Sequence, residues 1–174
     1  ARSGGKLGTM WECVDLYPLN GQWVLSFSPM FLGDSKTVCL TGTMDFQNAC
    51  FSWHTRSELD WGTEYYAPQS MADGCGRTIV MAWQNAWDWM PWWQDFGPVS
   101  SEGWCGCMAL PRSVSLDQNG RMISAPVEEL KTLRSNEQKT GWITVDGQPR
   151  ELPCADPVAF EMEVKIDLQH TQSR

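Results

Sequence analysis

The stretch Thr9-Met10-Trp11-Glu12-Cys13-Val14-Asp15-Leu16-Tyr17-Pro18-Leu19 decides how the rest of the chain is interpreted. It is an apolar, aromatic run with one glutamate near its middle. An unpaired buried charge is costly, so Glu12 must be paired, exposed in a cleft, or protonated. Apolar neighbours favour the protonated form of a carboxyl group, which is the form a general acid needs. The alternative is a strand on which Glu12 simply faces solvent, and on this stretch alone that is the simpler interpretation.

Short β patterns separated by turn residues continue from this stretch. Asn20-Gly21 is a strong hairpin signal, and Asp73-Gly74 and Gln118-Asn119-Gly120 mark later turns. The expected strands are Met10–Leu19, Gln22–Phe27, Thr37–Thr43, Cys50–Ser57, Tyr65–Met71, Arg77–Trp83, Met108–Leu116 and Arg121–Ala125. Four strands in about fifty residues, followed by a second set, predict an all-β fold with a repeated four-stranded unit, as in β-propellers. One or two helical turns are expected within residues 126–134, with Pro126 at the first helical position.

A separate module is predicted after Ser135, where the composition becomes polar. Trp142–Val145 and Ala159–Leu168 have strand patterns, and in the second of these apolar and charged residues alternate strictly. Such a period of two is typical of a strand with one buried and one solvated face. The expected domains are therefore residues 1–135 and 136–174.

Composition and charge limit the kind of partner. The 174 residues include 13 Lys and Arg and 21 Asp and Glu, so the formal net charge is 13 minus 21, or −8. Nucleic-acid binding depends on basic patches, and anionic membrane surfaces attract Lys and Arg runs, so neither partner is expected. No apolar stretch approaches the roughly 18 residues of a membrane-spanning helix.

The seven cysteines are odd in number and show no regular framework spacing. This favours reduced thiols and a cytoplasmic setting. Cys75, Cys105 and Cys107 could be imagined around zinc, but structural zinc ligands usually come as pairs two to four residues apart. No metal or other cofactor is expected. The chain begins with Ala1 and not Met, which indicates a chain already cut, so the lack of a visible signal peptide says little.

Four stretches carry a resemblance to the β-fructosidases, glycoside hydrolase family 32. Trp11–Tyr17 resembles the family's Glu-Cys motif, usually Trp-Glu-Cys-Pro-Asp, with Val14 in place of proline. Leu59–Gln69 is similar to an Asp-x-Gly-x-Asp-Phe-Tyr-Ala-Pro-Gln element, and Gly76–Trp83 to a Gly-Arg-Arg-Ile strand. Trp104–Arg112 resembles Trp-x-Gly-x-Leu-x-Leu-Pro-Arg. One such motif would be a weak signal, but four in order, covering most of the chain, are a strong one.

The resemblance implies a five-bladed β-propeller followed by a β-sandwich. Residues 9–134 would be about the last two blades with a linker helix, and residues 136–174 the first strands of the sandwich. These enzymes act on sucrose or fructans by retaining catalysis, for which two carboxyl groups are needed. By resemblance Glu12 is the general acid/base. The expected nucleophile motif, Trp-Met-Asn-Asp-Pro-Asn-Gly, and the Arg-Asp-Pro motif do not stand in this sequence. The nucleophile is therefore expected outside this chain, which alone should be inactive.

The resemblance also suggests residues that bind substrate. Asp60 matches a position that contacts the sugar or tunes the acid/base, although it could equally be a turn residue before Gly62. Neighbours alternate along a strand, so one of Tyr65 and Tyr66 should face the site, and Tyr66 matches the family better. A Trp-rich segment adds three candidates, Trp83, Asn85 and Trp87. Their aromatic faces and amide group are suited to binding a sugar. The alternative is that they only cover the rim of the fold.

Two further residues are expected to be structural. Cys13 should be a small buried residue on the face opposite Glu12, and Arg112 should form a structural ion pair.

Two functions from different classes remain open. The first is a retaining β-fructofuranosidase whose nucleophile is supplied elsewhere, and the second is a non-catalytic sugar-binding or structural module derived from the family. In both cases exposed sheet edges and apolar faces predict self-association or a chain that supplies the missing blades.

Overall fold

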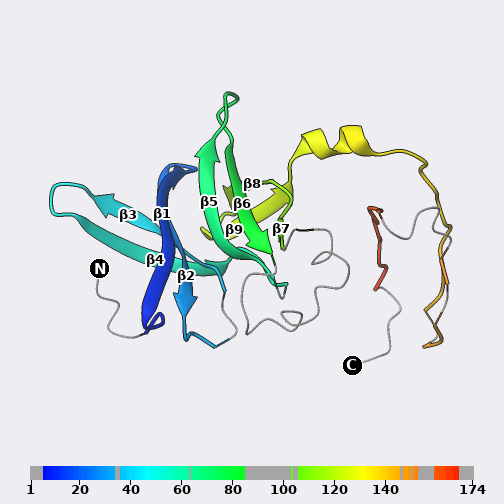
Figure 1. Cartoon of the computed structure of the whole chain (residues 1–174), viewed down its shortest axis with the longest axis horizontal. Coiled ribbons are helices and arrows are strands. Elements are labelled where there is room, and N and C mark those ends of the chain that lie inside the picture. The colour runs from blue at the N-terminus through cyan, green and yellow to red at the C-terminus, as the bar shows by residue number, and fades with distance from the viewer. Residues whose placement is uncertain are drawn as a thin grey trace. The chain divides into compact units, whose positions relative to one another are not determined.

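The computed structural model describes residues 6–33, 36–62, 64–84, 103, 106–145, 147–149, 151–152 and 159–168 (Figure 1). The chain divides into two compact units, Ala1–Val127 and Glu128–Arg174. In the described part of the chain, every strand belongs to the first unit. The domain boundary expected at residue 135 stays a prediction.

The first unit holds two antiparallel sheets that follow one another along the chain. The first has the order β1-β2-β3-β4, and its strands are Met10–Leu19, Gln22–Met30, Val38–Asp45 and Cys50–Glu58. The second has the order β5-β6-β8-β9, from Tyr66–Ala72, Thr78–Gln84, Arg112–Leu116 and Met122–Pro126, while the two-residue β7 (Cys107–Met108) also pairs with β6. The expected all-β fold is confirmed, while the second sheet has five strands because β7 joins it beside β6.

Local turn chemistry accounts for this chain path. Asn20 and Gly21 both have positive φ, +48° and +77°, which is the two-residue turn that matches the twist of an antiparallel pair. The turns that begin at Asp73 and Asp117 share one pattern. In each, the aspartate side chain accepts backbone N–H groups two and four residues further on. The Arg77 guanidinium, followed by the backbone contacts, lowers the pKa of Asp73, and the backbone N–H of Arg121 is the main cause of the lowered pKa of Asp117.

The expected strand over Met108–Leu116 is broken at Pro111. Proline has no N–H to donate, so a continuous ladder cannot pass through it. Beside the break, Ala109 N donates to Ala82 O at 2.8 Å and Val127 N donates to Pro111 O at 3.1 Å. One expected strand therefore becomes β7 and β8.

The core of the first unit draws on both sheets. One cluster joins Tyr17, Val24 and Cys39 of the first sheet with Val80 and Val114 of the second. A second cluster covers another part of the first sheet and includes Leu7, Phe27, Val38 and Leu40. The two sheets are therefore packed as one body, which fixes how the strand ends of one sheet meet those of the other.

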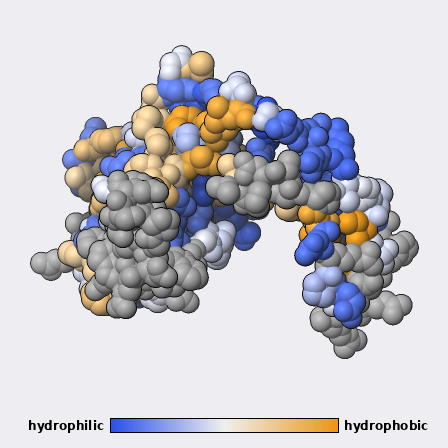
Figure 2. Space-filling view, turned by 45° about the vertical axis from the view of Figure 1, so that its right-hand side comes forward, coloured by the Kyte–Doolittle hydropathy of each residue, from blue (hydrophilic) through white to orange (hydrophobic). Residues whose placement is uncertain are grey.

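The second unit contains a short 3-10 helix, η2 (Glu128–Leu133), where helical turns were expected. In its described residues, neither Trp142–Val145 nor Ala159–Leu168 forms a strand, contrary to expectation. The apolar side chains of the second segment are exposed, for example Ile166 at 75%. Figure 2 shows apolar surface beside hydrophilic residues in this unit. Alternation alone does not make a strand, since an isolated strand has no partner for its backbone groups. No helix of the described residues is long and apolar enough to cross a membrane.

Candidate active site

Glu12 lies on β1, where the first sheet meets β5 of the second. The Tyr66 hydroxyl, 54 residues away in the sequence, donates a hydrogen bond to Glu12 Oε2. Glu12 is partly buried and Tyr66 is 5% exposed. The glutamate is therefore neither an isolated buried charge nor a freely solvated side chain. The phenol holds one carboxyl oxygen in place, and a general acid/base must be held where it can reach the substrate.

Trp11 fixes the strand next to this carboxyl group. Its ring stacks on Phe27 with centroids 4.1 Å apart and planes 15° from parallel. Its Nε1 donates to Leu7 O at 2.8 Å. The start of β1 is therefore anchored on one face, and Glu12, as the next residue, leaves the strand from the other face.

Cys13 is exposed, which corrects the expectation of a small buried residue. The pairing of β1 with β2 shifts between Glu12 and Asp15, so a β-bulge interrupts the ladder at this point. Cys13 has a φ of +49°, in the left-handed region that side chains rarely adopt. Simple alternation fails here because the bulge adds a residue to one strand and turns the following side chains.

Three residues for which no such role was expected, Ser28, Gln69 and Asp15, make contacts at the same junction. The Ser28 hydroxyl oxygen accepts the Ala67 N–H at 3.0 Å, and Gln69 Nε2 donates to Cys13 O at 3.0 Å. The Asp15 carboxylate accepts the Ser70 N–H at 2.7 Å. Asp15 and Gln69 stand inside the motifs quoted above, but their contacts depend on a sheet junction that no local pattern reveals.

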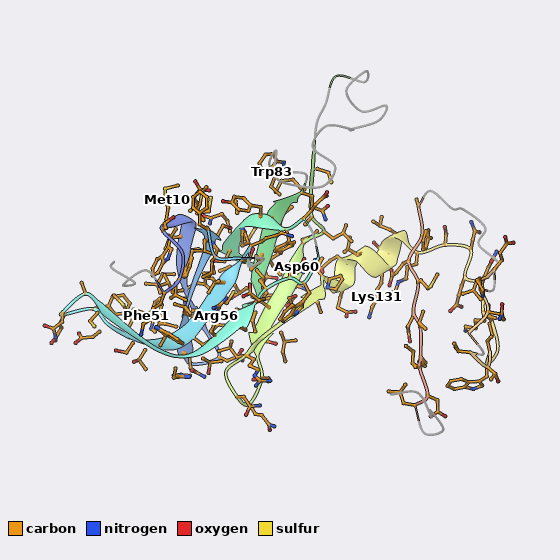
Figure 3. All side chains as sticks on the ribbon, turned by 90° about the horizontal axis from the view of Figure 1, so that it is seen from below. Met10, Phe51, Arg56, Asp60, Trp83 and Lys131 are labelled. Atoms are coloured by element: carbon orange, nitrogen blue, oxygen red, sulfur yellow. The ribbon has the colours of Figure 1, made fainter. Side chains whose placement is uncertain are left out.

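Asp60 lies shortly after the end of β4 (Figure 3). Its side chain already has partners within the chain. Its Oδ1 lies 2.7 Å from Arg112 Nη1, and its Oδ2 accepts the Gly62 N–H at 2.7 Å. The expected ion pair of Arg112 is confirmed. The guanidinium also lies 4.3 Å from the centre of the Tyr65 ring. Burial raises the pKa of the Tyr65 hydroxyl to about 12, and the Arg112 cation opposes this rise. Contact of Asp60 with a sugar stays a prediction.

Trp83, on β6, lies near the same junction. The two other candidates for sugar binding from this segment, Asn85 and Trp87, are not among the described residues. Trp83 pairs with Tyr66 across β5 and β6 and packs with Tyr66 and Ala67 in a small cluster. Its indole lies so close to Gly106 that a Cβ there would be 2.9 Å from Nε1. The structure thus brings Glu12, Tyr66 and Trp83 together, and among the residues it describes no group of three His, Cys, Asp or Glu could hold a metal ion.

The chain is similar to known proteins over most of its length. The family model "Glycosyl hydrolases family 32 N-terminal domain" matches residues 1–126. The sucrose-6-phosphate hydrolase of Bacillus subtilis is 34% identical over 176 residues, which cover 95% of this chain and 35% of that enzyme. The raffinose invertase of Escherichia coli is 34% identical over 155 residues, covering 84% of this chain and 31% of that enzyme.

A solved structure of a β-fructofuranosidase is also similar to this chain. The β-fructofuranosidase of Bombyx mori in complex with sucrose superimposes with a TM-score of 0.66 and 30% identity, covering 78% of this chain and 30% of that one. The chain spans about a third of the length of the relatives it matches. The match to most of the chain shows that it belongs to glycosyl hydrolase family 32.

Proposed function

We propose that this chain is the acid/base-bearing part of a retaining β-fructofuranosidase that acts on sucrose or fructans. The observation that carries the proposal is the pairing of Glu12 with the Tyr66 hydroxyl at the junction of the two sheets. Glu12 protonates the departing glycosidic oxygen and later removes a proton from the water that releases the fructosyl group. The names of the relatives, sucrose-6-phosphate hydrolase and raffinose invertase, support the substrate class.

The two sheets would be two blades of the family's propeller, and the chain after residue 135 would begin its sandwich. The motif that carries the nucleophile is absent from this sequence. A covalent intermediate needs that second carboxyl group, held about 5–5.5 Å from the first. The nucleophile is therefore supplied by polypeptide outside these 174 residues, either joined to this chain or associated with it.

Hydrolysis of sucrose by the purified chain tests the proposal, with the mass measured by light scattering in the same buffer. The chain alone should release no fructose. Addition of a chain that carries the Asn-Asp-Pro-Asn motif should restore release, and the two together are called the active assembly below. Robust turnover by a 19.7 kDa monomer would contradict both the role of Glu12 and the external nucleophile.

A non-catalytic sugar-binding module is the second candidate, and the absence of the nucleophile motif favours it. This function predicts that the chain binds sucrose but that no nucleophile-bearing chain restores hydrolysis. Calorimetric titration of sucrose into the chain, run beside the activity measurement, separates the two.

A further inference from the structure

Two strained residues stand beside the pair formed by Glu12 and Tyr66. Cys13, with a φ of +49°, directly follows Glu12, and Ala67, with a φ of +52°, directly follows Tyr66. Both strands change pairing register at these points. Left-handed backbone at a residue with a side chain costs about 1–3 kcal/mol and persists only where surrounding contacts enforce it. The two bulges must therefore be held by specific partners.

Each bulge is held by a side chain from the other sheet. The Ser28 hydroxyl oxygen, on β2, accepts the N–H of Ala67 on β5. In return, the Gln69 amide on β5 donates to the carbonyl oxygen of Cys13 on β1. The ties are reciprocal, so a shift of either strand at its bulge would stretch a hydrogen bond to the other sheet.

Ser28 has the more direct position of the two. It pairs with Glu12 across β1 and β2, so both side chains leave the sheet on the same face. It is fully buried, with 0% of its surface exposed. Ser28 thus lies opposite Glu12 on the first sheet, and its hydroxyl group binds Ala67, the residue that follows Tyr66 on the second sheet. Ser28 itself has no exposed surface, so its replacement by alanine would remove this partner of the Ala67 N–H without opening the Ser28 position to solvent.

We propose that Ser28 is a positioning residue for the acid/base, with Gln69 as a second, weaker tie. By holding the Ala67 bulge against β2, Ser28 sets where the Tyr66 hydroxyl lies relative to the Glu12 carboxyl group. This inference rests on the proposed function only for its catalytic consequence, since the geometric claim concerns the pair itself. Ser28 is not proposed to touch the substrate.

The geometric claim is tested on the full 174-residue chain without any activity measurement. The chain has three tyrosines, so labelling the ring carbon that bears the hydroxyl gives three carbon NMR signals. Tyr66→Phe assigns one of them, and Glu12→Ala gives the shift caused by loss of the acceptor. We expect Ser28→Ala to move the Tyr66 signal at least half as far in the same direction.

A matched control is available on the same strand. Ser26 is also a buried serine, 2% exposed, but it pairs with Asp15 and not with Glu12. Ser26→Ala should leave the Tyr66 signal in place. An unchanged Tyr66 signal in Ser28→Ala, or an equal movement in Ser26→Ala, would overturn the proposal. If Ser28→Ala unfolds, Gln69→Leu at an exposed position replaces it, and it must move the Tyr66 signal by a smaller amount in the same direction.

The catalytic consequence is tested in the active assembly with two substrates. Sucrose has a poor leaving group that needs a proton, whereas p-nitrophenyl β-fructofuranoside has a good one that does not. Ser28→Ala should lower kcat/KM for sucrose roughly tenfold, as the loss of one hydrogen bond allows, and kcat/KM for the nitrophenyl substrate much less. A general structural defect would lower both equally, and that result would overturn the positioning role.

The same measurement on Glu12→Gln keeps this inference separate from the proposed function. If Glu12→Gln fails to show the difference between the substrates, Glu12 is not the acid/base and the proposed function is wrong. If Glu12→Gln shows it and Ser28→Ala does not, only the role of Ser28 is wrong.

Discussion

Glu12 and Asp60 are both carboxyl groups beside the junction of the two sheets, but their partners differ in kind. Asp60 has a guanidinium on one oxygen and a backbone N–H on the other. Glu12 has a neutral phenol on Oε2. Both Asp60 oxygens are therefore engaged by groups of the chain, whereas the Glu12 contact is with one oxygen and comes from a neutral group. This difference in partners, which the two motifs do not reveal, is the reason to expect proton transfer at Glu12 and a structural role for Asp60.

The largest effect is expected from Glu12→Gln in the active assembly. Glutamine keeps the shape of the side chain but has no proton to transfer. Turnover of sucrose should fall by about 10²–10⁴-fold, the usual contribution of general acid/base catalysis. Steady-state kinetics with circular dichroism as a fold control checks this. Near-normal turnover would remove Glu12 from the mechanism.

A smaller loss is expected from Tyr66→Phe, which removes the hydrogen bond to Glu12. A hydrogen bond to a charged group contributes about 1.5–3 kcal/mol, so kcat/KM for sucrose should fall by about 10–100-fold. The control is Tyr65→Phe. The Tyr65 hydroxyl is buried and has no hydrogen-bond partner in the described structure, so its loss should leave activity unchanged. Equal losses in the two variants would mean that Tyr66 acts only through packing.

Asp60→Asn tests whether Asp60 stabilises the fold. The Asp60 and Arg112 side chains are 15% and 23% exposed, so the pair is mostly desolvated. Loss of its charge should lower the free energy of unfolding by about 1–3 kcal/mol, because Arg112 is left without a counter-ion.

The pair of Arg56 and Glu58 supplies the control. Its carboxylate is as buried as that of Asp60, but its guanidinium is 36% exposed and can be solvated when the pair is broken, so Glu58→Gln should cost less than Asp60→Asn. Urea unfolding of both variants measures the difference. A stable Asp60→Asn variant with a raised KM for sucrose would instead support the predicted contact of Asp60 with the sugar.

The smallest effect concerns Cys39 in the core shared by the two sheets. Burial raises its pKa from 9.0 to about 12, so the folded chain keeps the thiol proton where the unfolded chain loses it. The contribution of the neutral Cys39 thiol to the free energy of unfolding is complete below pH 9 and is lost as the pH rises toward 12. The free energy of unfolding should therefore decline from pH 9 to 10 by up to about 1 kcal/mol. Tyr65 adds to the slope above pH 10.

Cys39→Ala should flatten the slope between pH 9 and 10 in urea titrations. Because alanine also leaves a cavity, the slopes and not the absolute stabilities are compared. An unchanged slope would mean that another group causes the loss.

The sequence predicted those parts of the molecule that depend on local chemistry. Asn20-Gly21 gave the first hairpin, and the strand that bears Glu12 followed from its pattern. Cys13 was predicted wrongly because alternation assumes an unbroken ladder, and the bulge is enforced by Gln69 from another sheet. Ser28 carried no signal at all, since its importance arises from a residue 39 positions away. The segment 159–168 shows the converse, because a perfect alternating pattern forms no strand there without a partner.

The left-handed residues Cys13 and Ala67 also bear on how such a protein could be improved. Glycine at either position would remove the steric cost of the backbone, but it would also give the unfolded chain more freedom. Relief of the backbone strain, about 1–3 kcal/mol, outweighs the added freedom of the unfolded chain, about 0.4–1 kcal/mol. A screen for heat resistance would therefore select glycine at both positions, although the backbone groups there are the ones that tie the two sheets together.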